Sequence, residues 1–151
     1  MERIDITTNR KAFRDYEILE RLEAGIALVG SEVKSLRHSK ASLDEAFARI
    51  EDDEIFVHNL HIAPYAQASY LNVESKRARK LLLHLGQIRK LGDKTAQRGL
   101  TLIPLKMYFN SRGIVKVELG LARGKKFYDK REDVKRRDAD MSMRKALKHQ
   151  R

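Results

Sequence analysis

Two alternating apolar stretches with a turn between them most constrain what this chain can fold into. Apolar or β-branched side chains occupy every second position across Thr101–Phe109 and again across Val115–Leu121. The residues between them, Asn110–Gly113, have the composition of a turn. Because successive side chains of a strand point to opposite faces, this period of two predicts a hairpin with one buried face. Pro104 lies inside the first strand and predicts an edge or a bulge there.

Other segments predict a mainly β domain. The further predicted strands are residues 16–22, 46–50, 55–60 and 81–83. Residues 86–97 predict a helix because Ile88 and Leu91 lie three apart, and residues 32–37 fit either a short helix or a continued strand. Five or six short strands with one to three short helices predict a small, OB-fold-like closed β-barrel, and a β-sandwich fits the same pattern.

Charge divides the chain into two parts. The 151 residues hold 32 Lys and Arg against 21 Asp and Glu, a formal charge of +11. Residues 1–122 hold 20 basic and 16 acidic residues, a net of +4, whereas residues 123–151 hold 12 and 5, a net of +7. Few sizeable apolar side chains follow residue 128, so this part cannot bury enough surface to offset its conformational entropy. We expect a folded domain at 1–122 and a basic C-terminal tail at 123–151.

The order of charges in the tail favours a helix once the tail is docked. Three acid-then-base pairs lie four residues apart, at Glu132 and Arg136, Asp133 and Arg137, and Asp140 and Arg144. Each such pair stabilises a helix by ~0.2–0.5 kcal/mol, too little to order an isolated segment. We therefore expect the tail to be disordered when free and helical when bound to a partner.

Composition argues against several classes of protein. The chain has no Cys, which excludes disulfides and thiolate ligands and fits a reducing, cytoplasmic setting. No apolar run approaches the ~20 residues that a membrane span needs, and no secretory signal opens the sequence. The five His residues lack metal-ligand spacing, and no nucleophile elbow or nucleotide-binding glycine motif occurs. We expect no catalytic residues, no metal and no cofactor.

Clusters of Lys and Arg favour a nucleic-acid partner over a membrane. The clusters are residues 9–11, 34–37, 76–80 and 123–126. Lys and Arg at this density bind phosphates, and Phe127 and Tyr128 beside the last cluster could stack on bases. A membrane anchor would need larger apolar residues opposite the charge.

An ordered series of short blocks resembles the SmpB family, the bacterial proteins that bind transfer-messenger RNA. The blocks are residues 9–12, 23–28, 30–37, 61–65, 79–84, 101–106, 115–122, 124–126 and 129–131. They cover nearly the whole chain. No single block is specific, but their order is.

The resemblance implies a function in trans-translation. Such a protein has an OB-type barrel, binds the tRNA-like part of transfer-messenger RNA and delivers it to ribosomes stalled on truncated messages. The tail then enters the empty mRNA path at the decoding centre of the small subunit and becomes helical. A monomer is expected. A general ribosome-associated protein that binds structured RNA is the alternative, since it would share the barrel, the charge and the tail.

The resemblance also assigns roles to residues. The expected RNA-binding residues are Asn9, Arg10, Lys11, Glu32, Lys34, Arg37, Arg79, Lys80, Leu81, Lys125 and Lys126. The expected ribosome-binding residues of the tail are Tyr128, Asp129, Lys130, Arg131, Val134, Lys135 and Arg136. Glu32 leaves two possibilities open: its carboxylate could accept from base amino or ribose hydroxyl groups, or it could form an ion pair that orients Lys34 or Arg37.

Overall fold

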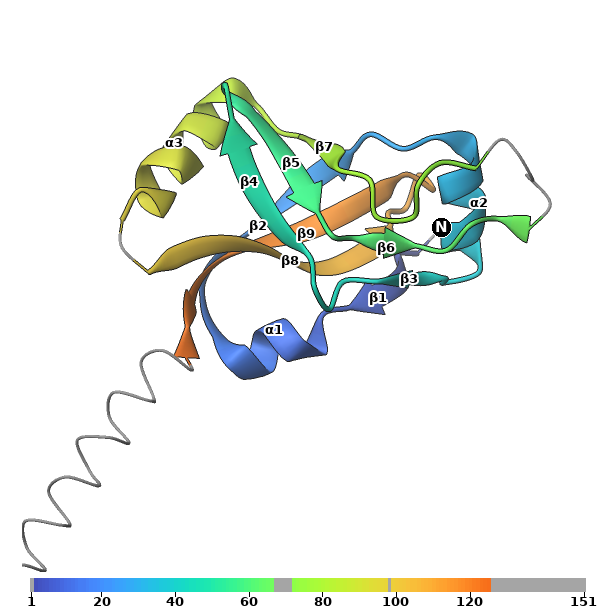
Figure 1. Cartoon of the computed structure of the whole chain (residues 1–151), viewed down its shortest axis with the longest axis horizontal. Coiled ribbons are helices and arrows are strands. Elements are labelled where there is room, and N and C mark those ends of the chain that lie inside the picture. The colour runs from blue at the N-terminus through green and yellow to red at the C-terminus, as the bar shows by residue number, and fades with distance from the viewer. Residues whose placement is uncertain (1, 67–71, 98, 126–151) are drawn as a thin grey trace, which may run out of the picture.

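A computed structural model describes residues 2–66, 72–97 and 99–125 of the chain (Figure 1). The strands are β1 Ile4–Thr8, β2 Tyr16–Ile26, β3 Ala41–Ser42, β4 Phe47–Glu51, β5 Glu54–His58, β6 His61–Ile62, β7 Arg79–Leu82, β8 Leu100–Phe109 and β9 Val115–Gly124. The helices are α1 Arg10–Asp15, α2 Gly30–Arg37 and α3 Leu85–Thr95. Every strand that the sequence predicted is present, with ends shifted by a few residues.

Six strands form a closed antiparallel ring. They pair in the order β8–β4–β5–β7–β2–β9, and β9 returns to pair with β8. β1 adds to the ring by pairing with β8, while β3 and β6 form a separate two-stranded sheet. The ring encloses the main core, whose most buried members include Ile55, Val57 and Leu119. Its closure confirms the mainly β prediction and removes the sandwich alternative.

The hairpin of β8 and β9 forms as predicted, with one correction. The prediction placed Ile103, Leu105 and Met107 on a single face of the first strand. A register shift between Pro104 and Lys106 puts a bulge in β8, as the proline had indicated. Because the extra residue reverses the alternation, Met107 joins the main core, whereas Ile103 and Leu105 pack in a second cluster against α1. On β9 the predicted inward face is confirmed, since Val117 and Leu119 are fully buried.

The structure decides between the two possibilities left open for residues 32–37, a short helix or a continued strand. Residues 30–37 form α2 rather than a continued strand. The carboxylate of Glu32 accepts a hydrogen bond of 3.0 Å from the backbone N–H of Val29, which satisfies one of the free donors at the helix start. α3 buries Ile88 and Leu91, the pair that predicted it. None of the helices within the described ranges is long and apolar enough to cross a membrane.

The close approach of β8 to β9 depends on Gly120. A Cβ atom at this position would lie 2.8 Å from Cδ1 and 3.0 Å from Cγ of Leu105. Leu105 is 0% exposed, so its side chain has no solvent to move into. Only a residue without a side chain fits between the two strands here.

We expect Gly120→Ala to lower the free energy of unfolding by about 1–3 kcal/mol, the usual cost of overpacking. Urea denaturation followed by circular dichroism measures it. Gly86→Ala is the matched control, because a Cβ at Gly86 in α3 meets no atom within 4 Å, and it should be neutral or slightly stabilising. Equal stabilities for the two variants would contradict the role assigned to Gly120.

Candidate nucleic-acid interface

Asn9 fixes α1 to the strands around it. Its Oδ1 accepts a hydrogen bond from the N–H of Ala12 at 3.0 Å, the geometry of a helix N-cap. Its Nδ2 donates to the carbonyl oxygens of Leu43 at 3.1 Å and Pro104 at 3.0 Å. Its own N–H donates to the carbonyl of Leu105 at 2.7 Å. The side chain is thus fully bonded, and Asn9 is only 2% exposed.

The two cations that follow Asn9 face outward. Arg10 is exposed, and Nζ of Lys11 lies 3.0 Å from Oε1 of Glu45. The hydrogen bond with Glu45 raises the pKa of Lys11, so the ammonium stays charged at neutral pH. This ion pair is well exposed to solvent, so it contributes little to stability and can exchange for another anion.

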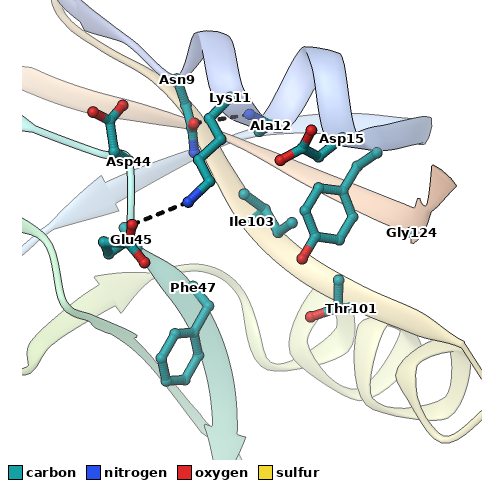
Figure 2. Close-up of a pocket in the computed structure, with 12 residues that line it drawn as sticks. Asn9, Lys11, Ala12, Asp15, Asp44, Glu45, Phe47, Thr101, Ile103 and Gly124 are labelled. Carbon is teal, nitrogen blue, oxygen red and sulfur yellow. Dashed lines mark hydrogen bonds and ion pairs between the residues drawn. The ribbon is translucent and has the colours of Figure 1, made fainter. Parts of the chain in front are cut away.

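A hollow of about 430 Å³ lies beside α1, between β4, β8 and the end of β9 (Figure 2). Three carboxylates line it, those of Asp15, Asp44 and Glu45, against the single ammonium of Lys11. Gly124, the last residue of β9, forms part of its wall. Because carboxylates predominate, the hollow itself does not favour a phosphate. A polyanion would meet Arg10 on the outside of α1 instead.

Glu32 lies in a buried network of ion pairs. Its Oε1 accepts from Nη2 of Arg77 and its Oε2 accepts from Nε of Arg79, both at 2.5 Å. Glu32 is 3% exposed and Arg79 is 0% exposed. Of the two possibilities left open for Glu32, the ion pair is present, but its partners are not Lys34 or Arg37. The carboxylate pairs instead with two arginines about 45 residues away in the sequence.

The other guanidinium nitrogens of Arg79 donate hydrogen bonds to backbone carbonyls. Its Nη1 donates to Leu60 at 2.5 Å and Arg77 at 3.2 Å, and its Nη2 donates to Ser75 at 3.1 Å. A buried guanidinium needs this complete set of partners, since an unpaired buried charge costs several kcal/mol. The arginine thereby joins the chain after β5, the segment before β7, and α2.

The protonation state of Glu32 follows from the network. Burial alone would raise the pKa of Glu32, but hydrogen bonds from Arg77, from the N–H of Val29 and from Arg79 outweigh it and hold the pKa below its ordinary value. The carboxylate is therefore ionised at neutral pH. The charge that it carries is satisfied inside the protein.

The exposed side of α2 carries the cations expected there. Lys34 and Arg37 are exposed. Nζ of Lys34 lies 5.6 Å from the ring centre of Tyr65, and the ring of His38 stacks on that tyrosine at 6.4 Å with 8° between the planes. On the inner side, Oγ of Ser35 donates to the carbonyl of Ala63 at 2.6 Å and seats the helix.

On β7, strand alternation divides the expected residues between two environments. Lys80 is exposed, with its Nζ 3.5 Å from Oε1 of Glu54, whereas Leu81 is 1% exposed and belongs to the core. Arg79 points inward like Leu81. Lys125, which follows β9, is exposed. Lys126 and the expected tail residues from Tyr128 to Arg136 lie outside the described residues.

Burial divides the expected contact residues into two groups. The side chains of Asn9, Glu32, Arg79 and Leu81 are each at most 3% exposed, so they offer almost no surface to a nucleic acid in this structure. Three of the four are polar groups that hold α1 or α2 in place. The exposed members of the list are Arg10, Lys34, Arg37, Lys80 and Lys125, and Lys11 is partly exposed.

Sequence reasoning missed two residues of the site. The sequence places Arg77 in the basic cluster 76–80 and Tyr65 in the block 61–65, without indicating what either side chain contacts. A signal for Arg77 is its spacing from Arg79: the two residues lie two apart, so extended backbone turns both toward the same side, where Glu32 lies. No pattern in the sequence indicates the stacking of Tyr65 on His38, because it joins a loop to a helix end.

Metal-binding side chains do not gather in the part of the chain that the structure describes. Within residues 2–66, 72–97 and 99–125, no group of three or more His, Cys, Asp or Glu side chains is placed to hold a metal ion. The perturbed carboxylate, Glu32, is enclosed and bonded on both oxygens.

Comparison with known proteins agrees with this description. The SsrA-binding protein of Syntrophobacter fumaroxidans is 54% identical over 146 residues, covering 97% of this chain and 90% of the relative. That of Thermus thermophilus is 58% identical over 131 residues, covering 87% and 91%. A solved structure described as "tmRNA-SmpB: a journey to the center of the bacterial ribosome" is 60% identical with a TM-score of 0.68, covering 79% of this chain and 83% of that one.

The family model described as SmpB protein matches residues 6–149. This match spans the ring of strands, the three described helices and the basic segment beyond them. The sequence blocks that predicted the resemblance fall inside it. The chain therefore belongs to the SmpB family.

Proposed function

We propose that the folded domain of this protein, called the body below to distinguish it from the tail, binds the tRNA-like part of transfer-messenger RNA. The protein then carries this RNA to stalled bacterial ribosomes for trans-translation. The observation that carries this proposal is membership of the SmpB family over nearly the full chain, with SsrA-binding proteins as relatives. The 60% identical structure of a tmRNA–SmpB assembly on the ribosome supports the same partners. The protein acts as an RNA-binding factor in the cytoplasm and not as an enzyme.

The geometry supports a division of labour within the body. Exposed cations on α1, α2 and β7 contact RNA phosphates, which set the affinity and the salt dependence of binding. Each of these elements offers one such exposed cation to the phosphates: Arg10 on α1, Lys34 on α2 and Lys80 on β7. Asn9 and the Glu32–Arg79 pair do not touch the RNA but hold α1 and α2 at the spacing that the RNA requires.

The tail has a separate role in the proposal. Residues 123–151 carry a net charge of +7, and the resemblance assigns Tyr128, Asp129, Lys130, Arg131, Val134, Lys135 and Arg136 to the ribosome. A basic segment that becomes helical only in a polyanionic channel couples its folding to its binding. In this proposal the body selects the RNA, and the tail binds in the mRNA path of the ribosome when that path is empty.

The first test is selectivity for the RNA. The full-length protein should bind the tRNA-like part of transfer-messenger RNA and keep it when an unrelated structured RNA of equal length is added at fixed salt. Filter binding or fluorescence anisotropy measures the competition. Equal displacement by both RNAs would instead support a general ribosome-associated RNA-binding protein.

The second test separates body from tail. A chain ending at Lys126 should bind the free RNA with nearly full affinity, because the exposed cations of the body remain, but should lose peptide tagging on stalled ribosomes. Both are measured in a purified translation system. Loss of RNA affinity as severe as the loss of tagging would show that the division is wrong.

The third test concerns the buried ion pair. We expect Glu32→Gln to lower the free energy of unfolding by about 3–5 kcal/mol, because it leaves Arg77 and Arg79 as uncompensated charges. RNA affinity should fall in parallel as α2 shifts. Glu45→Gln is the control: it also removes a carboxylate from an ion pair, but an exposed one, and should cost less than about 1 kcal/mol.

The difference in stability between the unchanged protein and Glu32→Gln should depend on pH, and the sign of this dependence follows from the pKa of Glu32. Since the folded pKa of Glu32 is lowered, its ionised form stabilises the protein at neutral pH, and this stabilisation is lost as the pH falls from the ordinary value of 4.5 through the folded pKa. The stability difference between the unchanged protein and Glu32→Gln should therefore shrink in acid. A difference that stays constant from pH 7 down to acid unfolding would rule out an ionised pair.

A further inference from the structure

The outer surface of three neighbouring strands carries rings and cations together. On β4, β5 and β7, the inward positions are filled by core residues such as Ile55, Val57 and Leu81, which are at most 1% exposed. The alternate positions of the same strands therefore point outward. Among the residues at these positions are Phe47, Arg49, Phe56, His58 and Lys80, which we name the outer strand face. The remaining outward positions of the same strands hold Glu51, Glu54 and Leu82.

Strand register places these side chains in rows. Arg49 of β4 lies opposite Phe56 of β5, and Phe56 lies opposite Lys80 of β7, so one row crosses three strands as cation, ring, cation. In the next row Phe47 lies opposite His58. Directly opposite residues of antiparallel strands approach within about 5 Å at Cβ, close enough for a continuous surface.

Contacts within the face keep its rings in place. The rings of Phe47 and His58 stack with centres 5.3 Å apart and 18° between their planes. Cζ of Arg49 lies 5.7 Å from the ring centre of Phe47. Arg49 and Lys80 are exposed, and the three rings are half-buried. In Figure 1 none of the three helices crosses in front of β4 and β5, and Figure 2 shows the Phe47 ring standing off β4 at the rim of the hollow.

The charge of the face matches a polyanion. Arg49 and Lys80 are the charged residues among the five, and both are positive, while the outward carboxylates of Glu51 and Glu54 lie at the turn end of β4 and β5. Oε1 of Glu54 lies 3.5 Å from Nζ of Lys80. Both side chains of this pair are about half exposed, so the pair contributes little and leaves Lys80 able to bind a phosphate. The acidic turn of the hairpin, Glu51–Glu54, marks the end of the face that an RNA backbone would avoid.

We propose that the outer strand face binds unpaired bases of the transfer-messenger RNA by stacking, with Arg49 and Lys80 on the adjoining phosphates. This deepens the proposed function and rests on it. Rings that alternate with cations at strand spacing suit single-stranded loops, whose bases are free to stack on aromatic side chains. Of the five residues, only Lys80 was expected to contact RNA, so the face adds a second kind of contact to the phosphate contacts of α1 and α2.

If Phe47 and Phe56 served only to stabilise the sheet, the structure of the free protein would be the same. Aromatic residues favour strands and pack on cross-strand neighbours, which would explain Phe47 and Phe56 without a ligand. Conservative substitutions separate the two roles. Leucine keeps an apolar side chain on the strand but removes the stacking ring, whereas tyrosine keeps the ring.

The test compares full-length variants for binding to the tRNA-like part of transfer-messenger RNA. Joint Phe47→Leu and Phe56→Leu substitution should weaken binding roughly 5- to 150-fold per stacked base lost, and joint substitution by Tyr should restore it. The slope of log affinity against log salt should not change, since no phosphate contact is removed. Joint Lys34→Ala and Arg37→Ala substitution is the comparator, and should reduce both the affinity and that slope.

A second RNA identifies the bases as the ligand. A copy with abasic nucleotides in its unpaired loops should bind the unchanged protein as weakly as the Leu variant binds the intact RNA, and the Leu variant should not distinguish the two RNAs. Circular dichroism and denaturation of each variant show that the proteins compared are folded.

Two results would overturn the inference. One is undiminished RNA binding by the Leu variant while the Lys34 and Arg37 variant binds weakly; the proposed function would then stand and the inference alone would fail. The other is weakened binding that Tyr does not restore, which would assign both rings to packing. If instead the unchanged protein yields this RNA to an unrelated competitor, the proposed function itself has failed.

Discussion

A single buried guanidinium holds together parts of this protein that lie far apart in its sequence. Arg79 binds the carboxylate of Glu32 on α2 and the carbonyl oxygens of Leu60 and Ser75. Its strand, β7, lies between β5 and β2 in the ring, and Arg79 itself is paired with Val57 of β5. Taking two charges out of water is costly, and a buried pair of this kind specifies an arrangement more than it stabilises one. The position of α2, and of the cations on it, depends on this arrangement.

Much of the fold follows from local patterns in the sequence. The period of two across Val115–Leu121 determined which residues of β9 face the core, and the paired apolar residues Ile88 and Leu91 determined which face of α3 is buried. Pro104 indicated the bulge correctly, because a residue without an N–H cannot complete a regular ladder. The consequence of the bulge was harder to foresee. Its position decides which residues of β8 change face, and that depends on the pairing partners.

The candidate site was less predictable than the fold for a physical reason. A cluster of cations in a sequence does not say which of them are exposed. In β7, Arg79 and Lys80 are adjacent and carry the same charge, yet one lies in the interior and the other on the surface. The partners of Glu32 could not be found by proximity in the sequence, because Arg77 and Arg79 lie about 45 residues away and meet Glu32 only in the folded structure. Rows that cross strands, such as that of Arg49 and Phe56, likewise become visible only with the register.

The double pairing of β9 has a mechanical consequence. From Tyr16 to Gly25 the strand β2 pairs along one edge of β9, and from Leu100 to Phe109 the strand β8 pairs along the other. The chain beyond Gly124 is therefore attached to the strand that is bonded most extensively on both sides. A pull on that end along the strand axis would load two ladders of hydrogen bonds in shear at the same time, instead of opening one pair after another. The strand that leads into the basic segment therefore resists a pull better than a strand paired along one edge only.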